Sequence, residues 1–266
     1  MLWTALILGV VEGLTEFLPI SSTGHLILAG HLLGLEGKRA EVFEVFIQLG
    51  AILAVVWEYR ATLLSVASGL ARRAESRRFV VHLLWAFLPA ALLGLLLHPF
   101  LSDHLFRPRV VAGALVAGAL AILAVEARPR RIRTRDALET TRGQAILIGM
   151  AQCLALWPGF SRSAATILGG LLVGLDRRAA TEFSFFLAIP TLLSATLYDL
   201  AVHHSWLLPG DAVWLGISFA VSFLVALVTI RWLLRFLAHH DFRPFAWYRL
   251  ALGALVLLVE VWRWRS

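Results

Sequence analysis

The chain of 266 residues has very little of what a soluble protein exposes to water. Charged residues make up 15% of the sequence and apolar residues 59%, and the mean hydropathy is +0.80. A soluble globular domain has about 25% charged and about 45–50% apolar residues. These departures exclude a soluble domain, a disordered chain and a fibrous repeat.

Cysteine is almost absent, since Cys153 is the only one. A single cysteine excludes an intramolecular disulfide and a zinc site with several cysteine ligands. The apolar neighbours of Cys153 predict a buried, inert thiol. A cleavable signal peptide is not expected either, because residues 1–11 are too short for one and Glu12 and Glu16 follow at once.

Lysine is nearly absent as well, because Lys38 is the only lysine among 24 basic residues, and the net charge is +7. This charge does not predict a nucleic-acid partner, because most of the arginines lie between apolar stretches. Such loops are typical of a polytopic membrane protein, whose cytoplasmic loops are rich in Lys and Arg. Segments 60–78, 128–142 and 231–243 are therefore predicted to face the cytoplasm, and 201–211, which has neither residue, to face the outer side.

Long apolar runs are abundant, and a spanning helix needs about 20 mostly apolar residues. Two pairs of apolar segments are shorter, and each pair is interrupted by a polar break, PISST or PGFSRS. These pairs, 2–18 with 23–35 and 143–157 with 162–175, are typical of re-entrant hairpins, because irregular backbone at membrane depth needs protein or water around it. We predict an all-α integral membrane protein with six spans, over residues 42–59, 79–97, 109–127, 180–200, 211–231 and 244–262.

The two broken segments are related by an internal repeat, because residues 9–35 align without a gap to residues 149–175. Three predicted spans follow each copy, and because three is odd the second copy would be inverted. Inverted repeats with broken helices place a binding site where the breaks meet, near mid-membrane. We predict one membrane domain with an N-terminal repeat (1–127), a basic cytoplasmic loop (128–142) and a C-terminal inverted repeat (143–266).

The first broken segment carries two carboxylates in a region where polar side chains are costly. Glu12 and Glu16 are four residues apart, so they share one face of a helix. Such a pair suits a hard divalent cation, Mg²⁺ or Ca²⁺, bound through oxygen and bridging to a phosphate. Alternatively, one carboxylate holds a proton and acts as a general acid or base, or the pair forms a structural ion pair with Arg162.

Both breaks open a helix with polar side chains. The free N–H groups and the dipole of a helix N-terminus form an anion site, and the Arg162 guanidinium matches phosphate oxygens. His25 follows Ser22 by three residues and is a candidate proton carrier. The hydroxyls could instead be plain helix caps. The candidate phosphate ligands are Ser21, Ser22 and Thr23 before a helix expected from Gly24, and Ser161, Arg162, Ser163 and Thr166 in the second break.

Two further groups of polar residues border the apolar segments. Gln48, at helical spacing from Glu44, could reach the cavity between the breaks, whereas Glu41 is equally well explained as an interfacial surface residue. Residues 176–178 are interpreted as a solvated turn.

The sequence resembles the undecaprenyl pyrophosphate phosphatase family, also called the bacitracin-resistance family, over essentially its whole length. The resemblance implies a hydrolase of the bacterial inner membrane with six spans and two re-entrant hairpins. Such an enzyme removes the terminal phosphate of the C55 lipid carrier pyrophosphate, so that the carrier is reused in peptidoglycan synthesis. The motifs that carry the resemblance are EGLTEFLPISSTGH (12–25), FEVFIQLGAILAV (43–55), QCLALWPGFSRSAATI (152–167) and EFSFFLAIP (182–190).

The resemblance also implies dependence on a divalent cation, an active site open to the periplasmic side and a homodimer. It assigns catalytic roles to Glu12, Glu16, Ser22, His25 and Arg162. Supporting roles go to Thr23, Ser161, Ser163, Thr166 and Gln48.

For the mechanism, we expect either that Ser22 attacks the phosphorus or that water does so with Ser22 positioning it. The competing class is a transporter, a flippase for the monophosphate lipid, because paired hairpins in inverted repeats are a transporter architecture. A channel fits less well, since it needs neither paired carboxylates nor a Ser22 and His25 pair.

Overall fold

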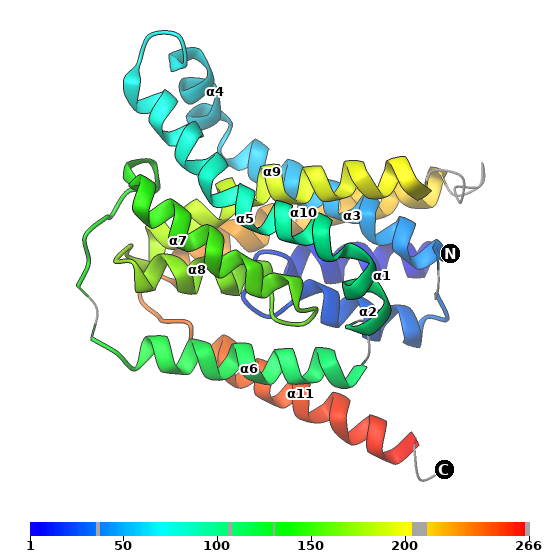
Figure 1. The fold of residues 1–266 in the computed structure, drawn as a ribbon. Coiled ribbons are helices and arrows are strands. Elements are labelled where there is room, and N and C mark those ends of the chain that lie inside the picture. Colours follow the sequence, from blue (N-terminus) through cyan, green and yellow to red (C-terminus); the bar gives the residue numbers. More distant parts are fainter. Residues whose placement is uncertain (36–37, 106–107, 130, 204–211, 264–266) are drawn as a thin grey trace.

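The computed structural model describes residues 1–35, 38–105, 108–129, 131–203 and 212–263, and this part of the chain is mostly helical (Figure 1). The predicted all-α class is therefore confirmed. The α-helices are α1 (Leu2–Thr15), α2 (Ser22–Leu32), α3 (Lys38–Glu58), α4 (Arg60–Gly69), α5 (Ala74–His104), α6 (Pro108–Glu126), α7 (Arg142–Gln152), α8 (Arg162–Leu172), α9 (Arg177–His203), α10 (Ala212–Phe236) and α11 (Arg243–Arg263), with 3₁₀ turns η1 (Ala137–Glu139) and η2 (Cys153–Leu156).

Four helices of the described chain are long and apolar enough to cross a membrane, namely α5 (through Leu97), α6, α9 (through Tyr198) and α10. They coincide with four of the six predicted spans. A fifth candidate is the pair formed by residues 46–58 of α3 and by α4, which is bent by 73° at Tyr59. Helix α11 covers the sixth predicted stretch but is not among these candidates. Several apolar helices thus support a multi-pass membrane protein.

Both predicted breaks lie between short helices, α1 and α2 in the first pair and α7 and α8 in the second. Helices α2 and α8 begin at Ser22 and Arg162, which are 140 residues apart. The start of α2 at Ser22 is two residues earlier than the expected start at Gly24. The residues that cap the two helices, Ser21 and Ser161, have positive φ angles of 74° and 78°. Few residues with a side chain adopt this backbone conformation, so the same strained turn opens both helices.

The two helix pairs lie in the middle of the molecule (Figure 1). On one side, α6 and α11 pack against each other, and α6 also contacts α2 and α8. On the other side, α1 packs along α10, α10 along α3, α7 along α5, and α8 along α9. Both breaks are therefore enclosed by helices, which is where irregular backbone in a membrane is tolerated.

Close backbone contacts hold α1, α3 and α10 together at glycines. A Cβ atom at Gly13 would lie 2.8 Å from the Ser222 carbonyl oxygen, and one at Gly50 would overlap the Phe219 carbonyl. Ser222 also donates a hydrogen bond of 2.7 Å to the Ile47 carbonyl oxygen. Small residues and interhelical hydrogen bonds are the usual means by which helices associate in a membrane, where apolar burial gives little driving force.

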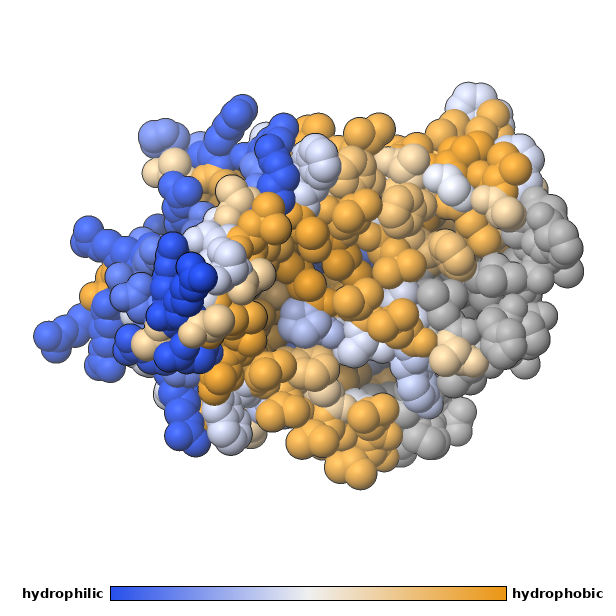
Figure 2. All heavy atoms as spheres, turned by 90° about the horizontal axis from the view of Figure 1, so that it is seen from above, coloured by the Kyte–Doolittle hydropathy of each residue, from blue (hydrophilic) through white to orange (hydrophobic). Residues whose placement is uncertain are grey.

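The surface divides into a hydrophilic end and an apolar middle (Figure 2). Exposed apolar side chains lie along the outer helices, as a lipid-facing surface requires. Examples are Leu92, Leu95 and Leu96 on α5, Leu224 and Val228 on α10, and Leu255 and Leu258 on α11.

Two sequence-based interpretations are corrected here. Arg177 and Arg178 are solvent-accessible as expected, but they are the first residues of α9 and not part of a turn, and the Arg177 guanidinium makes hydrogen bonds of 3.0 and 2.6 Å to the buried carboxylate of Glu126. Arg178 pairs with Glu182 at 3.0 Å. Cys153 is only partly buried, because it begins η2 next to the outward-facing Leu154, and its thiol contacts the Gly149 carbonyl oxygen at 3.6 Å.

Candidate active site

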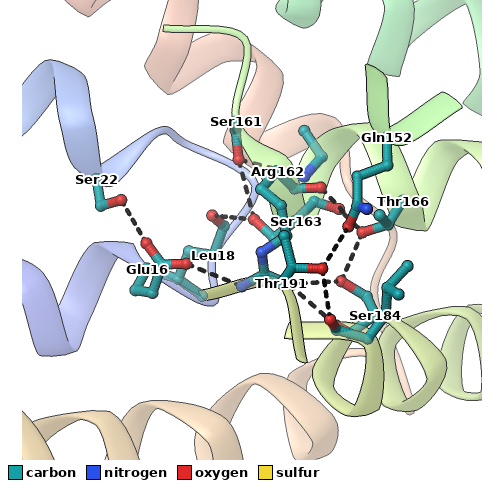
Figure 3. A network of polar contacts seen from close by, with 12 residues as sticks. Glu16, Leu18, Ser22, Gln152, Ser161, Arg162, Ser163, Thr166, Ser184 and Thr191 are labelled. Carbon is teal, nitrogen blue, oxygen red and sulfur yellow. Dashed lines mark hydrogen bonds and ion pairs between the residues drawn. The ribbon is translucent and has the colours of Figure 1, made fainter. Parts of the chain in front are cut away.

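The two breaks touch each other through side chains from both (Figure 3). Ser163 of α8 donates a hydrogen bond of 2.8 Å to the Leu18 carbonyl oxygen in the first break. Arg162, also of α8, donates one of 2.9 Å from Nη2 to Glu16 Oε1. Residues separated by more than 140 positions in the sequence therefore form one polar cluster, as the repeat predicted.

Glu16 lies at the centre of this cluster and is 6% exposed. Its Oε2 accepts a hydrogen bond of 2.5 Å from the Ser22 hydroxyl, while its Oε1 accepts the bond from Arg162 (Figure 3). Glu16 caps the end of α1, and Ser22 is the first residue of α2. The break thus folds the chain back so that the carboxylate orients the serine oxygen and can accept its proton.

Glu12 lies one helical turn before Glu16, since the Glu16 N–H bonds to the Glu12 carbonyl oxygen. Its side chain is fully buried, and neither carboxylate oxygen has a hydrogen-bond partner among the described residues. The carboxylates of Glu16 and Glu44 lie close enough to repel a charge on Glu12. A buried carboxylate without a donor, near two others, fits a site that a cation completes.

The side chains available as metal ligands decide which kind of cation could fit at Glu12 and Glu16. No group of three or more His, Cys, Asp or Glu side chains that could hold a metal occurs among the described residues. Glu12 and Glu16 would therefore supply only two carboxylates. Mg²⁺ is usually held by one or two carboxylates together with substrate phosphates and water, so the residues present fit such an ion.

The first turn of each broken helix is a candidate anion site. Ser21 Oγ accepts from the Gly24 N–H at 3.4 Å, and Ser161 Oγ accepts from the Ala164 N–H at 3.2 Å. Each cap satisfies one N–H group of its first turn, and earlier N–H groups remain at a positive helix end. Ser161 and Ser163 share a hydrogen bond of 2.9 Å.

The Arg162 guanidinium is hydrogen-bonded at Nη1 and Nη2 and has no partner at Nε. Nη1 donates to the Ser184 carbonyl oxygen at 3.0 Å and to its hydroxyl at 3.3 Å, and Ser184 Oγ also bonds to Thr166 at 2.7 Å. The buried Nε has no partner among the described residues. It is therefore a candidate donor to a phosphate oxygen, in a guanidinium that Glu16 and Ser184 hold in place.

His25 is bonded on both ring nitrogens, but not to Ser22. Its Nδ1 lies 2.7 Å from the Ser21 carbonyl oxygen, and its Nε2 lies 2.6 Å from the Tyr248 hydroxyl. Because a carbonyl oxygen only accepts, Nδ1 carries the proton, and in the neutral ring Nε2 accepts from Tyr248. The hydrogen-bond partner of Ser22 is Glu16, and a proton-carrying role for His25 stays a prediction.

Not every candidate joins the cluster. Thr23 and Gln48 are half-buried, and the hydrogen bonds found among the described residues do not include their side chains. Glu41 lies in α3 outside the residues whose side chains are described.

Sequence reasoning missed Ser184, Thr191 and Tyr248. Thr191 donates to Gln152 Oε1 at 3.3 Å (Figure 3). Ser184 and Thr191 are hydroxyls within the apolar helix α9, which is the signal that could have found them. Tyr248 gave no signal, because only the fold brings α11 to α2.

The sequence pattern that defines the family described as "Bacitracin resistance protein BacA" matches residues 5–255. The undecaprenyl-diphosphatase 2 of Rhodospirillum rubrum is 56% identical over 264 residues, which cover 98% of this chain and 96% of that protein. The undecaprenyl-diphosphatase of Dechloromonas aromatica is 52% identical, and the match covers 99% of this chain and 96% of that protein. The undecaprenyl-diphosphatase of Nitrosomonas europaea is 53% identical, and the match covers 97% of this chain and 94% of that protein. With the family pattern matched over nearly the whole chain, this protein belongs to the BacA family of bacitracin resistance proteins.

Proposed function

We propose that this protein is an undecaprenyl-diphosphatase that confers bacitracin resistance. The observation that carries this proposal is the contact of Glu16 with both Ser22 and Arg162, at 2.5 and 2.9 Å. A hydroxyl, a carboxylate that can accept its proton and a guanidinium with a free donor are the groups that phosphoryl transfer requires. The names of the relatives supply the substrate.

The substrate is a C55 isoprenoid pyrophosphate, and the bond that breaks joins its two phosphorus atoms through oxygen. In one route the Ser22 oxygen attacks the terminal phosphorus, its proton passes to Glu16, and the lipid monophosphate leaves. Water then hydrolyses the phosphoserine and releases inorganic phosphate. In the other route water attacks directly, and Ser22 positions it.

The protein's main contribution is to position the substrate and to stabilise negative charge on the transferring group. Arg162 Nε and the first N–H groups of α2 and α8 would bind the phosphoryl oxygens. Ser184 keeps the guanidinium in the orientation in which Nε is free. A Mg²⁺ or Ca²⁺ ion held by Glu12 and Glu16 would neutralise part of the pyrophosphate charge.

For the arrangement in the membrane we propose six spans, with α3, α5, α6, α9, α10 and α11 crossing and the α1–α2 and α7–α8 pairs re-entrant from opposite sides. Ser21 and Ser161, the two serines with positive φ, are 140 residues apart, which is the offset of the sequence repeat, and this agreement supports an inverted repeat. The arginine-rich segments support a cytoplasmic location for the α4–α5 turn and for 128–142. The site would then open to the periplasmic side of the inner membrane.

A second candidate function, flipping of the lipid monophosphate, is favoured by the same repeated hairpins. Two broken helix pairs meeting at one polar cluster are a common arrangement in transporters. A transporter alone would bind the lipid but release no phosphate. The two functions therefore differ in one measurable product.

The test is phosphate release from undecaprenyl pyrophosphate by the purified protein in detergent. We expect release with Mg²⁺ or Ca²⁺, loss of release with a chelator, and a loss of at least about 100-fold in Glu16→Gln. Glu58→Gln, which breaks the partly exposed ion pair with Arg231, is the matched control. No release from folded protein would contradict the phosphatase proposal and favour transport.

A further inference from the structure

Arg249 of α11 is a fully buried arginine with an unusual set of partners. No carboxylate pairs with it among the described residues. Instead its guanidinium donates only to backbone carbonyl oxygens. These belong to Ala114 and Leu115 of α6, at 3.1 Å each, to Pro19 at 3.0 Å and to Gly159 at 3.1 Å.

The last two acceptors belong to the two breaks and occupy equivalent positions in them. Pro19 and Gly159 are 140 residues apart, the spacing that relates Ser21 to Ser161. Each carbonyl lies two residues before a serine with positive φ. Ser22 follows Pro19 by three residues, and Arg162 follows Gly159 by three. One guanidinium thus joins the same point of both breaks, immediately before the residues that form the site.

The surroundings of Arg249 are shaped for this contact. A Cβ atom at Gly118 of α6 would overlap Nη2 of Arg249, so any side chain there would displace the guanidinium. Burying an arginine without a counter-ion is costly unless its donors are satisfied. The carbonyls of a broken helix are likewise left without partners. The guanidinium donors of Arg249 and the unpartnered backbone carbonyls therefore satisfy each other. The planar fork of arginine reaches several carbonyls at once, which a lysine ammonium could not.

We propose that Arg249 is a positioning residue for phosphoryl transfer, which holds the two breaks in register so that Ser22 and Arg162 act on the same phosphate. The effect on phosphoryl transfer rests on the proposed function, whereas the structural link between the two breaks does not. Arg249 contacts neither Ser22 nor Arg162 directly. It acts through the Pro19 and Gly159 carbonyls.

The first experiment compares kcat and KM in Arg249→Lys, Arg249→Met and Gly118→Ala. Misplacement of reacting groups by about 1 Å costs about 100-fold in rate, so we expect kcat to fall by about that factor in all three, with KM changed by less than about threefold. Gly118→Ala displaces the guanidinium and keeps the charge. Gly216→Ala is its control, because a Cβ there meets nothing within 4 Å. Wild-type kcat in Arg249→Lys or Gly118→Ala would overturn the proposal.

A second experiment does not depend on activity. Spin labels are placed at Leu14→Cys on α1 and Leu154→Cys on η2, both exposed positions, with the only native cysteine removed by Cys153→Ser. We expect one narrow distance distribution with Arg249 and a broadened or shifted one with Arg249→Lys. An unchanged distribution would overturn the proposal. If the wild-type protein released no phosphate, the proposed function would fail, but the spin labels would still test whether Arg249 holds the two breaks together.

Discussion

Ser22 and Glu16 are joined by a hydrogen bond of 2.5 Å in which the serine hydroxyl donates to the carboxylate. The same carboxylate accepts a bond from Arg162 at 2.9 Å. Glu16 therefore links Ser22 of the first break to Arg162 of the second, the two groups proposed to act on the phosphate. Proton acceptance by Glu16 would loosen its hold on Arg162 as the negative charge moves to the phosphoryl group.

Removal of the serine oxygen tests which route operates. We expect Ser22→Ala to lose more than about 100-fold in kcat, because either the nucleophile or its positioning group is gone. Trapping of ³²P on the protein during turnover separates the two routes. Ser68→Ala on the exposed helix α4 should leave turnover unchanged. Near-normal turnover of Ser22→Ala would contradict both roles.

The unpaired Nε of Arg162 predicts that positive charge alone is insufficient at this position. Arg162→Lys keeps one positive charge but cannot bind Glu16, Ser184 and a phosphate oxygen at once. We expect kcat/KM to fall by about 100-fold or more, as for the loss of a charge-stabilising donor in other enzymes. Arg178→Lys, at an exposed ion pair, is the control. Full activity of Arg162→Lys would exclude the proposed clamp.

The Tyr248 hydroxyl fixes the ring of His25, and this contact carries its own prediction. Tyr248→Phe removes a single hydrogen bond, which corresponds to about 1 kcal/mol, so we expect kcat to fall by about 3- to 10-fold. If Tyr248 acts only through His25, the same substitution should have no further effect in His25→Ala. Steady-state kinetics of the two single variants and the double variant measure this coupling. Additive losses would show that Tyr248 acts elsewhere.

Much of this site could be predicted from the sequence, and the reason is local. Glu12, Glu16 and Ser22 lie within one short motif, and the polar breaks stand out against apolar neighbours, so their clustering needs only a turn. The alignment of the two breaks then predicts that Arg162 lies near them. Ser184 and Tyr248 depend on how α9 and α11 pack, and no short-range pattern encodes that.

The boundaries and the surface turns were harder for a related reason. Arg177 gave the pattern of a solvated turn, but its partner Glu126 lies 51 residues earlier in the chain. The bend of 73° after α3 has no proline or glycine at Tyr59 to announce it. The Arg177–Glu126 ion pair and the bend at Tyr59 depend on contacts between segments far apart in the sequence, and such contacts cannot be inferred from a single sequence.

The unpartnered carboxylate of Glu12 predicts that a divalent cation stabilises the protein. A ligand that binds only the folded state raises the melting temperature as its concentration increases. We expect Mg²⁺ or Ca²⁺ to raise the melting temperature of the wild-type protein in detergent, and a chelator to reverse the rise. Glu12→Gln should abolish the cation effect, whereas Glu58→Gln should retain it. An equal rise in Glu12→Gln would place the cation elsewhere.

The close approach of α3 to α10 predicts a site at which one methyl group is destabilising. Gly50→Ala puts a Cβ where the Phe219 carbonyl lies, and the obstacle is backbone, so the helices must separate. Overpacking of this kind costs about 1–3 kcal/mol. The loss should appear as a lower unfolding midpoint in a denaturing detergent titration. Gly216→Ala on α10 adds the same methyl group with nothing within 4 Å, and it replaces glycine within a helix, so it should be neutral or stabilising. Equal midpoints for the two variants would show that α3 and α10 pack less closely than their glycines indicate.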